Sequence, residues 1–515
     1  MHLRPALAVP AVLTTLAVLV AGGLSVATAA DDHDSRSDHP AKVSASRSEA
    51  RAVLAEAQAV LSGEHRGDAT MALRDLWLHR GDLAGADRAA ANRLLARPDL
   101  PQSACTADNC YHWTTSGADA VPATDADSDG TPDYVEAVIA TVDGVHDRYV
   151  AAGYRAPKAD GVAGGDAKTD IYLEDVFDEG LYGYCTSDMP NPPATGPFDA
   201  WAYCVLDNDY AGFPTNTPLE NLQVTAAHEY FHAVQFGYDA LEDSWLMEAT
   251  ATWAEDELYD DVDDNLQYLP ESPLKRPAQP LDTFNEDGAQ YGTWVFFRFL
   301  TEQLDAAEGG LPTLVRDIWR RADGAAGGRD EYSIQAVANT LGDYGYDLTT
   351  LYALFATANR APARWYAEGA ANHYPTAPPA GSFKLTSAKK DSGWKAATLK
   401  HLSSVTARFV PGTGLSATSW KLRLTLDLPD RATRPAAVVT VYRKAGAPLV
   451  SVVPLSSSGG ATRKVGFGSK SVRYVEVTLA NVGTRYTCWN GGAYSCNGSS
   501  RDDGRKVLVR ATATR

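Results

Sequence analysis

Two histidines and one glutamate have a spacing that is typical of zinc enzymes. The segment His228-Glu229-Tyr230-Phe231-His232 fits the H-E-x-x-H template. On a helix the two imidazoles project from one face, one turn apart, so both can bind a single Zn²⁺. Glu229 lies beside them and can reach a water on the metal, which suits a general base. The alternative is a helix that carries two unrelated histidines.

A catalytic zinc needs a third protein ligand and an open fourth position. Glu248 follows 16 residues after His232, in a second segment of helical character that begins at Asp243 or Ser244. A helix–turn–helix would return Glu248 to the histidine face, which predicts a His₂Glu ligand set. Glu255 could accept a hydrogen bond from a ligand histidine, but a solvated carboxylate is the favoured interpretation.

The helix that must carry the histidines has clear start signals. Thr217 is a suitable N-cap, Pro218 suits the first helical position, and Glu220 completes a T-x-x-E capping box. We expect this helix to end at Gly237, because glycine commonly follows the last helical turn.

The H-E-x-x-H segment with a glutamate on the following helix resembles the gluzincin zinc metallopeptidases. The run from Ala226 to Glu255 is more closely similar to a group of secreted bacterial proteins classed as metalloproteases, as are residues 129–136 (DGTPDYVE) and 181–185 (LYGYC). The resemblance covers most of residues 70–300 and, less specifically, the C-terminal β region. It supplies a class of enzyme and no substrate.

This resemblance implies that His228, His232 and Glu248 are zinc ligands and that Glu229 is the base in hydrolysis of peptide bonds. One position departs from the thermolysin-like branch, which has an aspartate four residues after its glutamate ligand. Thr252 occupies that position here, so a ligand histidine must be oriented differently.

The tetrahedral oxyanion of such a reaction needs a donor besides the metal. Tyr291 is our candidate for this role and Tyr238 is a second, while plain packing is the alternative for each.

Residues 125–136 (DADSDGTPDYVE) fit the calcium loop of an EF-hand. Oxygen ligands are expected from six residues: Asp125, Asp127, Asp129, Thr131 through its carbonyl, Asp133 and Glu136. A helix from about Val135 to Ala152 can follow the loop, but Pro122 argues against one before it. We therefore expect a single structural site, similar to the loops of thrombospondin type 3 or dockerin modules, and an acidic solvated turn is the alternative. The acid-rich stretch Glu255–Asp264 lacks regular spacing and is expected to be a solvated loop.

The chain has 515 residues and a formal net charge of −19, which is unevenly distributed. Residues 376–515 hold 22 Lys and Arg against 6 Asp and Glu, whereas residues 1–375 hold 24 against 59. The basic C-terminal region would attract an anionic surface polymer or the acidic body of the same chain. Nucleic acid is not expected as a partner, because no reader motif accompanies the charge. Trp394, Trp420 and Trp489 could stack on sugars, but a place in the core is favoured for each.

The N-terminus indicates export. Arg4, an apolar run and an A-x-A site before Asp31 predict a signal peptide over residues 1–30 and a secreted, extracellular protein. No other segment approaches the length of a membrane span. Six cysteines allow 15 disulfide connectivities, and their three close couples favour local pairing. The couples are Cys105 with Cys110, Cys185 with Cys204, and Cys488 with Cys496.

These patterns predict an α+β protein in four parts. A helical propeptide or permanent subdomain (31–103) follows the signal peptide. A gluzincin-like zinc metallopeptidase domain (104–375) and a C-terminal antiparallel β-sandwich (376–515) come next. A secreted zinc endopeptidase acting on proteins or peptides is the leading hypothesis. The rival is a calcium-stabilised extracellular binding or adhesion protein with a catalytically silent zinc-peptidase fold.

Overall fold

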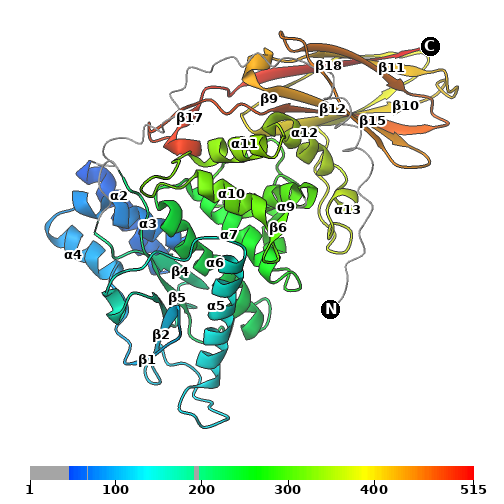
Figure 1. The fold of residues 1–515 in the computed structure, drawn as a ribbon. Helices are drawn as coiled ribbons and strands as arrows, with labels where there is room; N and C mark the ends of the chain where they lie inside the picture. The colour runs from blue at the N-terminus through cyan, green and yellow to red at the C-terminus, as the bar shows by residue number, and fades with distance from the viewer. Residues whose placement is uncertain (1–45, 66–67, 191–195, 305) are drawn as a thin grey trace.

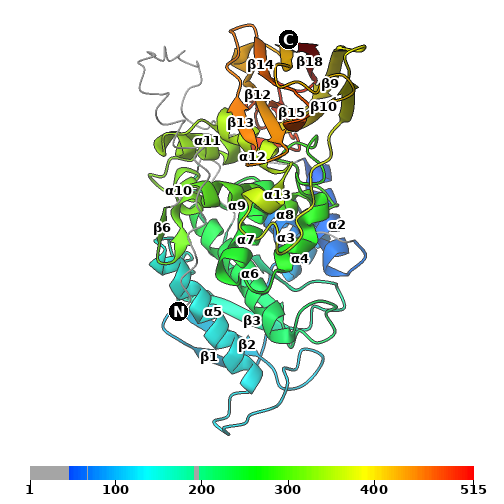
Figure 2. The ribbon, with the colours of Figure 1, turned by 90° about the vertical axis from the view of Figure 1, so that its right-hand side faces the viewer.

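The computed structural model describes residues 46–65, 68–190, 196–304 and 306–515. Helices and strands are both abundant and form several sheets, so the predicted α+β class is confirmed. A β-sandwich lies at one end of the molecule and helix α5 (Asp133–Ala151) at the other, with α6 (Pro218–Asp239) and α7 (Ser244–Leu258) between them (Figures 1 and 2). The predicted signal peptide lies outside the described residues.

Three helices open the described chain: α2 (Arg47–Leu61), α3 (Ala69–His79) and α4 (Gly85–Leu94). Ser46 caps α2 in a capping box with Glu49, because each residue's side chain bonds the other's backbone N–H. Helix α3 packs against strand β4 of the central sheet, and α2 and α4 pack against α3 (Figure 1).

The central sheet is mixed and has the strand order β1-β2-β3-β5-β4. Strands β2, β3 and β5 run parallel, while β1 and β4 are antiparallel edge strands. Strand β5 is buried along its whole length because α6 packs against it. The bounds are β1 Gln102–Cys105, β2 Asn109–Trp113, β3 Thr169–Glu174, β4 Gly183–Thr186 and β5 Tyr203–Asp207.

Further helices cover α6 and α7 on the side of the sandwich (Figure 1). The sequence predicts three of these helical runs, at 291–304, 311–321 and 348–358, but not α11. Their bounds are α8 Ala289–Gly292, α9 Trp294–Gln303, α10 Thr313–Arg321, α11 Ser333–Asp343, α12 Leu348–Ala358 and α13 Pro362–Trp365. Short 3₁₀ segments and a two-stranded pair complete this part: η1 Arg80–Asp82, η2 Ala163–Gly165, η3 Asp264–Glu271, β6 Ala307–Glu308 and β7 Leu311–Pro312.

The C-terminal region contains a five-stranded sheet, β13-β12-β15-β10-β8, and a four-stranded sheet, β14-β11-β18-β9. Residues of both sheets share one hydrophobic core, so the two sheets form a sandwich. All neighbours are antiparallel except β8 and β10, which pair in parallel. The bounds are β8 Gly381–Leu385, β9 Asp391–Leu399, β10 Ser403–Pro411, β11 Lys421–Asp427, β12 Pro435–Arg443, β13 Leu449–Val452, β14 Gly460–Gly466, β15 Val472–Asn481 and β18 Arg505–Thr514. The remaining small elements are η4 Arg431–Thr433, η5 Ser495–Asn497, β16 Tyr486–Thr487 and β17 Ser499–Ser500.

Burial differs between the two sheets. Strand β11 alternates, with Leu422, Leu424 and Leu426 in the core and residues between them outward. Strand β12 is buried on both faces because α12 covers its outer side. Trp420 is buried as predicted, but the core prediction is wrong for Trp394, which is 44% exposed.

Buried polar contacts join the sandwich to the rest of the chain. The His401 ring lies between Asp282 (Nε2–Oδ1 2.9 Å) and Asp503 (Nδ1–Oδ1 2.6 Å). Arg360 donates to Glu476 across the same boundary at 2.6 Å, and both side chains are 1% exposed. The basic region therefore contacts the acidic body of its own chain through specific pairs.

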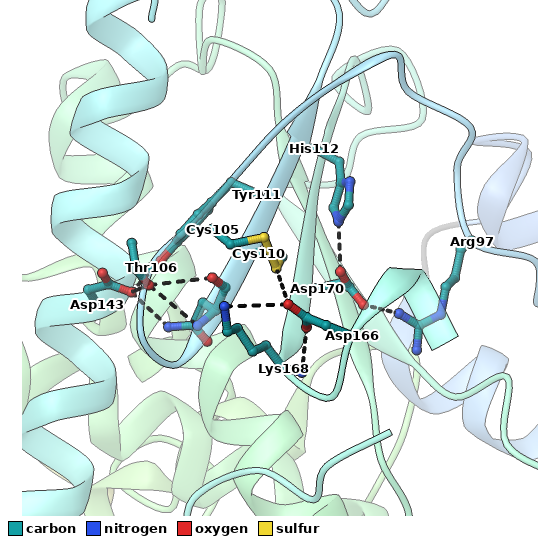
Figure 3. Close-up of a disulfide and its surroundings, with 11 residues drawn as sticks. Arg97, Cys105, Thr106, Cys110, Tyr111, His112, Asp143, Asp166, Lys168 and Asp170 are labelled. Atoms are coloured by element: carbon teal, nitrogen blue, oxygen red, sulfur yellow. Dashed lines mark hydrogen bonds and ion pairs between the residues drawn. A yellow bond between two sulfur atoms is a disulfide. The ribbon is translucent and has the colours of Figure 1, made fainter. Parts of the chain in front are cut away.

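Three disulfides have the local pairing that the sequence favours: Cys105–Cys110, Cys185–Cys204 and Cys488–Cys496. The first closes the hairpin of β1 and β2, as Figure 3 shows. Within the described residues no helix has the length and apolar character that a membrane crossing requires. Disulfides without such a helix are compatible with an extracellular protein.

Candidate metal centre

Helix α6 presents the two histidines. Thr217 and Glu220 form the predicted capping box, with Pro218 in the first turn. The helix continues to Asp239, so the predicted end at Gly237 is wrong. Gly237 is buried, and a Cβ there would meet the backbone N of Lys158 at 3.4 Å. The glycine therefore permits close packing inside the helix instead of ending it.

Helix α7 returns the third residue to the histidine face. The Nε2 atoms of His228 and His232 each lie 3.2 Å from a different carboxylate oxygen of Glu248. One potential ligand atom from each residue lies within 4.8 Å of the other two. Glu248 and His232 are fully buried. The structure thus brings together the three residues that the sequence predicts as ligands.

Both imidazoles are held by hydrogen bonds at Nδ1. The Nδ1 atom of His228 lies 2.6 Å from Oε1 of Glu255, and the Nδ1 atom of His232 lies 2.7 Å from Oε1 of Gln235. In a neutral imidazole with its hydrogen on Nδ1, the Nε2 lone pair is free and points toward Glu248, where a metal ion could bind. Glu255 is 4% exposed, so its interpretation as a solvated carboxylate is wrong.

The charges of the three residues are strongly coupled. Burial alone would lower the pKa of His228, but hydrogen bonds to Glu248 and Glu255 raise it well above its ordinary value. Burial alone would raise the pKa of Glu248, but His232 and His228 hold it well below its usual range. In the absence of a metal ion, the carboxylate and the two imidazoles thus favour each other's charged forms.

Glu229 lies one residue after His228, is 8% exposed and faces the same cavity. Its Oε2 accepts a hydrogen bond of 3.1 Å from the hydroxyl of Thr70 on α3. Burial raises the pKa of Glu229, although the two histidines act in the opposite direction.

The cavity beside His228 and Glu229 has a volume of about 230 Å³. Tyr291 lines it, and its hydroxyl donates to Oδ2 of Asp68 at 2.7 Å. Burial and the neighbouring Glu248 carboxylate raise the pKa of Asp68 to about 8. Tyr238 does not line this cavity, and its hydroxyl accepts a hydrogen bond from the backbone N of Arg155. The geometry therefore leaves Tyr291 as the tyrosine candidate at this site.

Two observations indicate that these donors fit a zinc ion. Two nitrogens and a carboxylate are a common ligand set for catalytic zinc. The Nε2 atom of His232 and Oε1 of Glu248 are buried and receive no hydrogen bond. Buried polar atoms rarely remain without a partner, and a cation between them would satisfy both.

The loop 125–136 has the backbone wrapping expected for calcium. Oδ2 of Asp125 accepts from the N–H of Gly130 at 3.0 Å, and Oδ1 of Asp129 accepts from the N–H of Thr131 at 2.7 Å. Carboxylate oxygens of Asp125, Asp127 and Asp129 lie within 4.8 Å of one another. Oδ1 of Asp125 is buried without a hydrogen bond. Helix α5 follows the loop, and no helix is present over residues 114–132, as the sequence predicts.

Two more loop acids lie close to these three. Oδ1 of Asp133 accepts from the N–H of Ala126 at 2.9 Å, which ties the helix start to the loop. Desolvation and the charges of the four loop aspartates raise the pKa of Glu136.

The prediction of a solvated loop for Glu255–Asp264 is wrong in its first half. Helix α7 continues through Asp256, whose side chain is fully buried and lies 2.8 Å from the guanidinium of Arg298. Burial raises the pKa of Asp256 to about 7.

Sequence reasoning missed three residues at the centre. Gln235 stands three positions after His232, a spacing that places both on one helical face and was visible in the sequence. Asp68 and Thr70 come from the N-terminal helices, and nothing in the sequence links them to the histidines.

No protein-family model matches this chain, and no curated protein matches it. One solved structure that it matches is a family GH115 4-O-methyl-alpha-glucuronidase with specificity for decorated arabinogalactans. The identity is 8%, the match covers 71% of this chain and 54% of that enzyme, and the TM-score is 0.14. The match thus spans about half the length of that enzyme, and at this TM-score it carries no argument about fold or function.

Proposed function

We propose that this protein is a secreted zinc-dependent peptidase of gluzincin type, with His228, His232 and Glu248 as the metal ligands. The observation that carries the proposal is the convergence of these three side chains from two helices, with His232 and Glu248 fully buried. Glu255 and Gln235, which hold the imidazoles at Nδ1, support it further.

A bound Zn²⁺ would lower the pKa of its water and polarise the carbonyl of the substrate. Glu229 is the group placed to take a proton from the attacking water and to deliver it to the leaving amine. Tyr291 lies at the cavity wall and could donate to the developing oxyanion, provided that its hydroxyl leaves Asp68.

The test compares the wild-type chain with Glu229→Gln. The variant retains the size of the side chain but cannot accept the proton, so it should keep zinc and lose peptide hydrolysis. Metal analysis and digestion of a peptide library, each with and without a chelator, measure both properties. A zinc-loaded wild type that cleaves no peptide would favour the alternative, a calcium-stabilised extracellular binding protein with a silent site.

We also infer that the loop 125–136 binds Ca²⁺ as a structural ion. Carboxylate oxygens of Asp125, Asp127 and Asp129 lie within 4.8 Å of one another, and a bound cation would offset the repulsion between them. The site lies at the start of α5, away from the zinc ligands, and we assign it no role in the reaction.

A further inference from the structure

We propose that Thr70 is a positioning residue for Glu229, and that the N-terminal helical segment (residues 46–65 and 68–99) is therefore a permanent part of the active site. This inference rests on the proposed peptidase function. Thr70 lies in the first turn of α3 and is 2% exposed. Its hydroxyl reaches Oε2 of Glu229 at 3.1 Å, and both residues line the cavity that His228 also lines.

The direction of this hydrogen bond is fixed by a second one. The backbone N–H of Cys185 on β4 donates to Oγ1 of Thr70 at 2.9 Å. An N–H group can only donate, so the hydroxyl uses a lone pair there and keeps its own hydrogen for the carboxylate of Glu229. The disulfide Cys185–Cys204 ties β4 to β5 at this position. The Thr70 hydroxyl therefore links Glu229 to strand β4, which the disulfide holds in place.

A second contact joins the same helix start to the cavity wall. Asp68 is the N-cap of α3, where its Oδ1 accepts from the N–H of Met71 at 2.8 Å. Its other oxygen, Oδ2, accepts from the hydroxyl of Tyr291 at 2.7 Å. One turn of α3 therefore holds both the proposed base and the candidate oxyanion donor.

The helical segment is built into the body of the protein. Trp77 is fully buried and donates from Nε1 to the carbonyl of Met189 at 2.7 Å. Arg74 donates to the carbonyl of Glu242 at 2.8 Å, directly before the helix that carries Glu248. Removal of the segment would expose the core around Trp77 and leave these acceptors without partners.

Arg97 anchors the end of the segment on the central sheet. Its guanidinium pairs with Asp170 of β3, as Figure 3 shows, and also reaches Asp160 at 2.7 Å and Asp188 at 2.8 Å. The sequence leaves open whether residues 31–103 are removed as a propeptide. These contacts favour retention of the part from residue 46 onward.

The experiment compares Thr70→Val with Thr70→Ser in the full secreted chain. Valine keeps the volume and removes the hydroxyl, whereas serine keeps the hydroxyl. We expect valine to lower kcat by about 10- to 100-fold, because a mispositioned catalytic group costs up to about that much. The KM should stay within about twofold, since uniform substrate binding is unaffected. Serine should restore most of kcat, and both variants should bind zinc at the wild-type ratio.

Wild-type kcat in Thr70→Val would overturn the inference. Equal losses in the valine and serine variants would also overturn it, because packing and not the hydroxyl would then matter. Mass spectrometry of the active secreted protein gives an independent answer if the valine variant does not fold. An active chain that begins at or before Ser46 supports the inference, and one that begins after Leu100 refutes it. Absence of turnover in zinc-loaded wild type would instead refute the proposed function, and this inference with it.

Discussion

Glu255 provides a sharp quantitative test of the metal centre. Its carboxylate lies 2.6 Å from Nδ1 of His228 and is 4% exposed. Glu255→Gln keeps an acceptor of the same size but removes the negative charge that strengthens the ligand imidazole. Loss of such a partner typically lowers metal affinity by about 10- to 100-fold. That range equals about 1.4 to 2.7 kcal/mol, in line with the value of one charged hydrogen bond.

The assay is competition for zinc against a chelator of known affinity, read as the dissociation constant. Asp261→Asn is the matched control, because it removes the same charge from an exposed position beyond the end of α7. The control should bind zinc within about twofold of wild type, since solvent and salt screen the charge of an exposed residue. Equal zinc affinity in wild type and Glu255→Gln would refute the assignment of Glu255 as the group that orients His228.

Three further predictions concern stability. Burial alone would lower the pKa of His401, but Asp282 and Asp503 raise it above its ordinary value. The protonated imidazole therefore stabilises the fold below about pH 6.5, and this stabilisation is lost as the pH rises through the folded-state pKa. Thermal midpoints of wild type should therefore fall across that window more than those of His401→Gln; parallel curves would contradict this. Calcium at 10 mM should stabilise the wild type by about 1.4 to 2.7 kcal/mol, given a dissociation constant of roughly 10⁻⁴–10⁻³ M, and Asp125→Asn should reduce the gain. Leu424→Ala, in the sandwich core, should cost about 2–5 kcal/mol in denaturant unfolding, and a cost under about 1 kcal/mol would show that the site is poorly packed.

Local signals predicted the elements of the metal centre well. The capping box at Thr217 fixes the start of α6, and the four-residue spacing of the histidines fixes their common face. The end of α6 was less predictable, because the helix continues past Gly237 to Asp239. Gly237 instead packs closely against the backbone of Lys158. A glycine that serves close packing has the same sequence appearance as one that ends a helix.

Long-range contacts could not be predicted in the same way. Thr70 reaches Glu229 across 159 positions of sequence, and no periodicity in either helix encodes that contact. Asp256 was misread because its charge suggested solvent, whereas Arg298, on a later helix, compensates that charge in the interior. In the sandwich, the edge strands β8 and β9 each bury only one residue fully, so their sequences carry little of the apolar pattern that predicts a strand.

The sandwich and the metal centre depend on each other through Asp243, the N-cap of the helix that carries Glu248. This carboxylate bonds no N–H of its own helix. Instead, its Oδ2 accepts from the backbone N–H of Cys496 at 2.6 Å, and its Oδ1 accepts from that of Asn497 at 3.2 Å. A chain truncated after residue 375 would lose both of these hydrogen bonds, and a hydrogen bond to a charged group contributes about 1.5–3 kcal/mol. The hydroxyl of Ser333, which donates to Oδ2 of Asp243 at 2.5 Å, would remain. We therefore expect the start of α7 to be less stable in the truncated chain. The C-terminal region therefore supports the start of the helix that carries the third ligand.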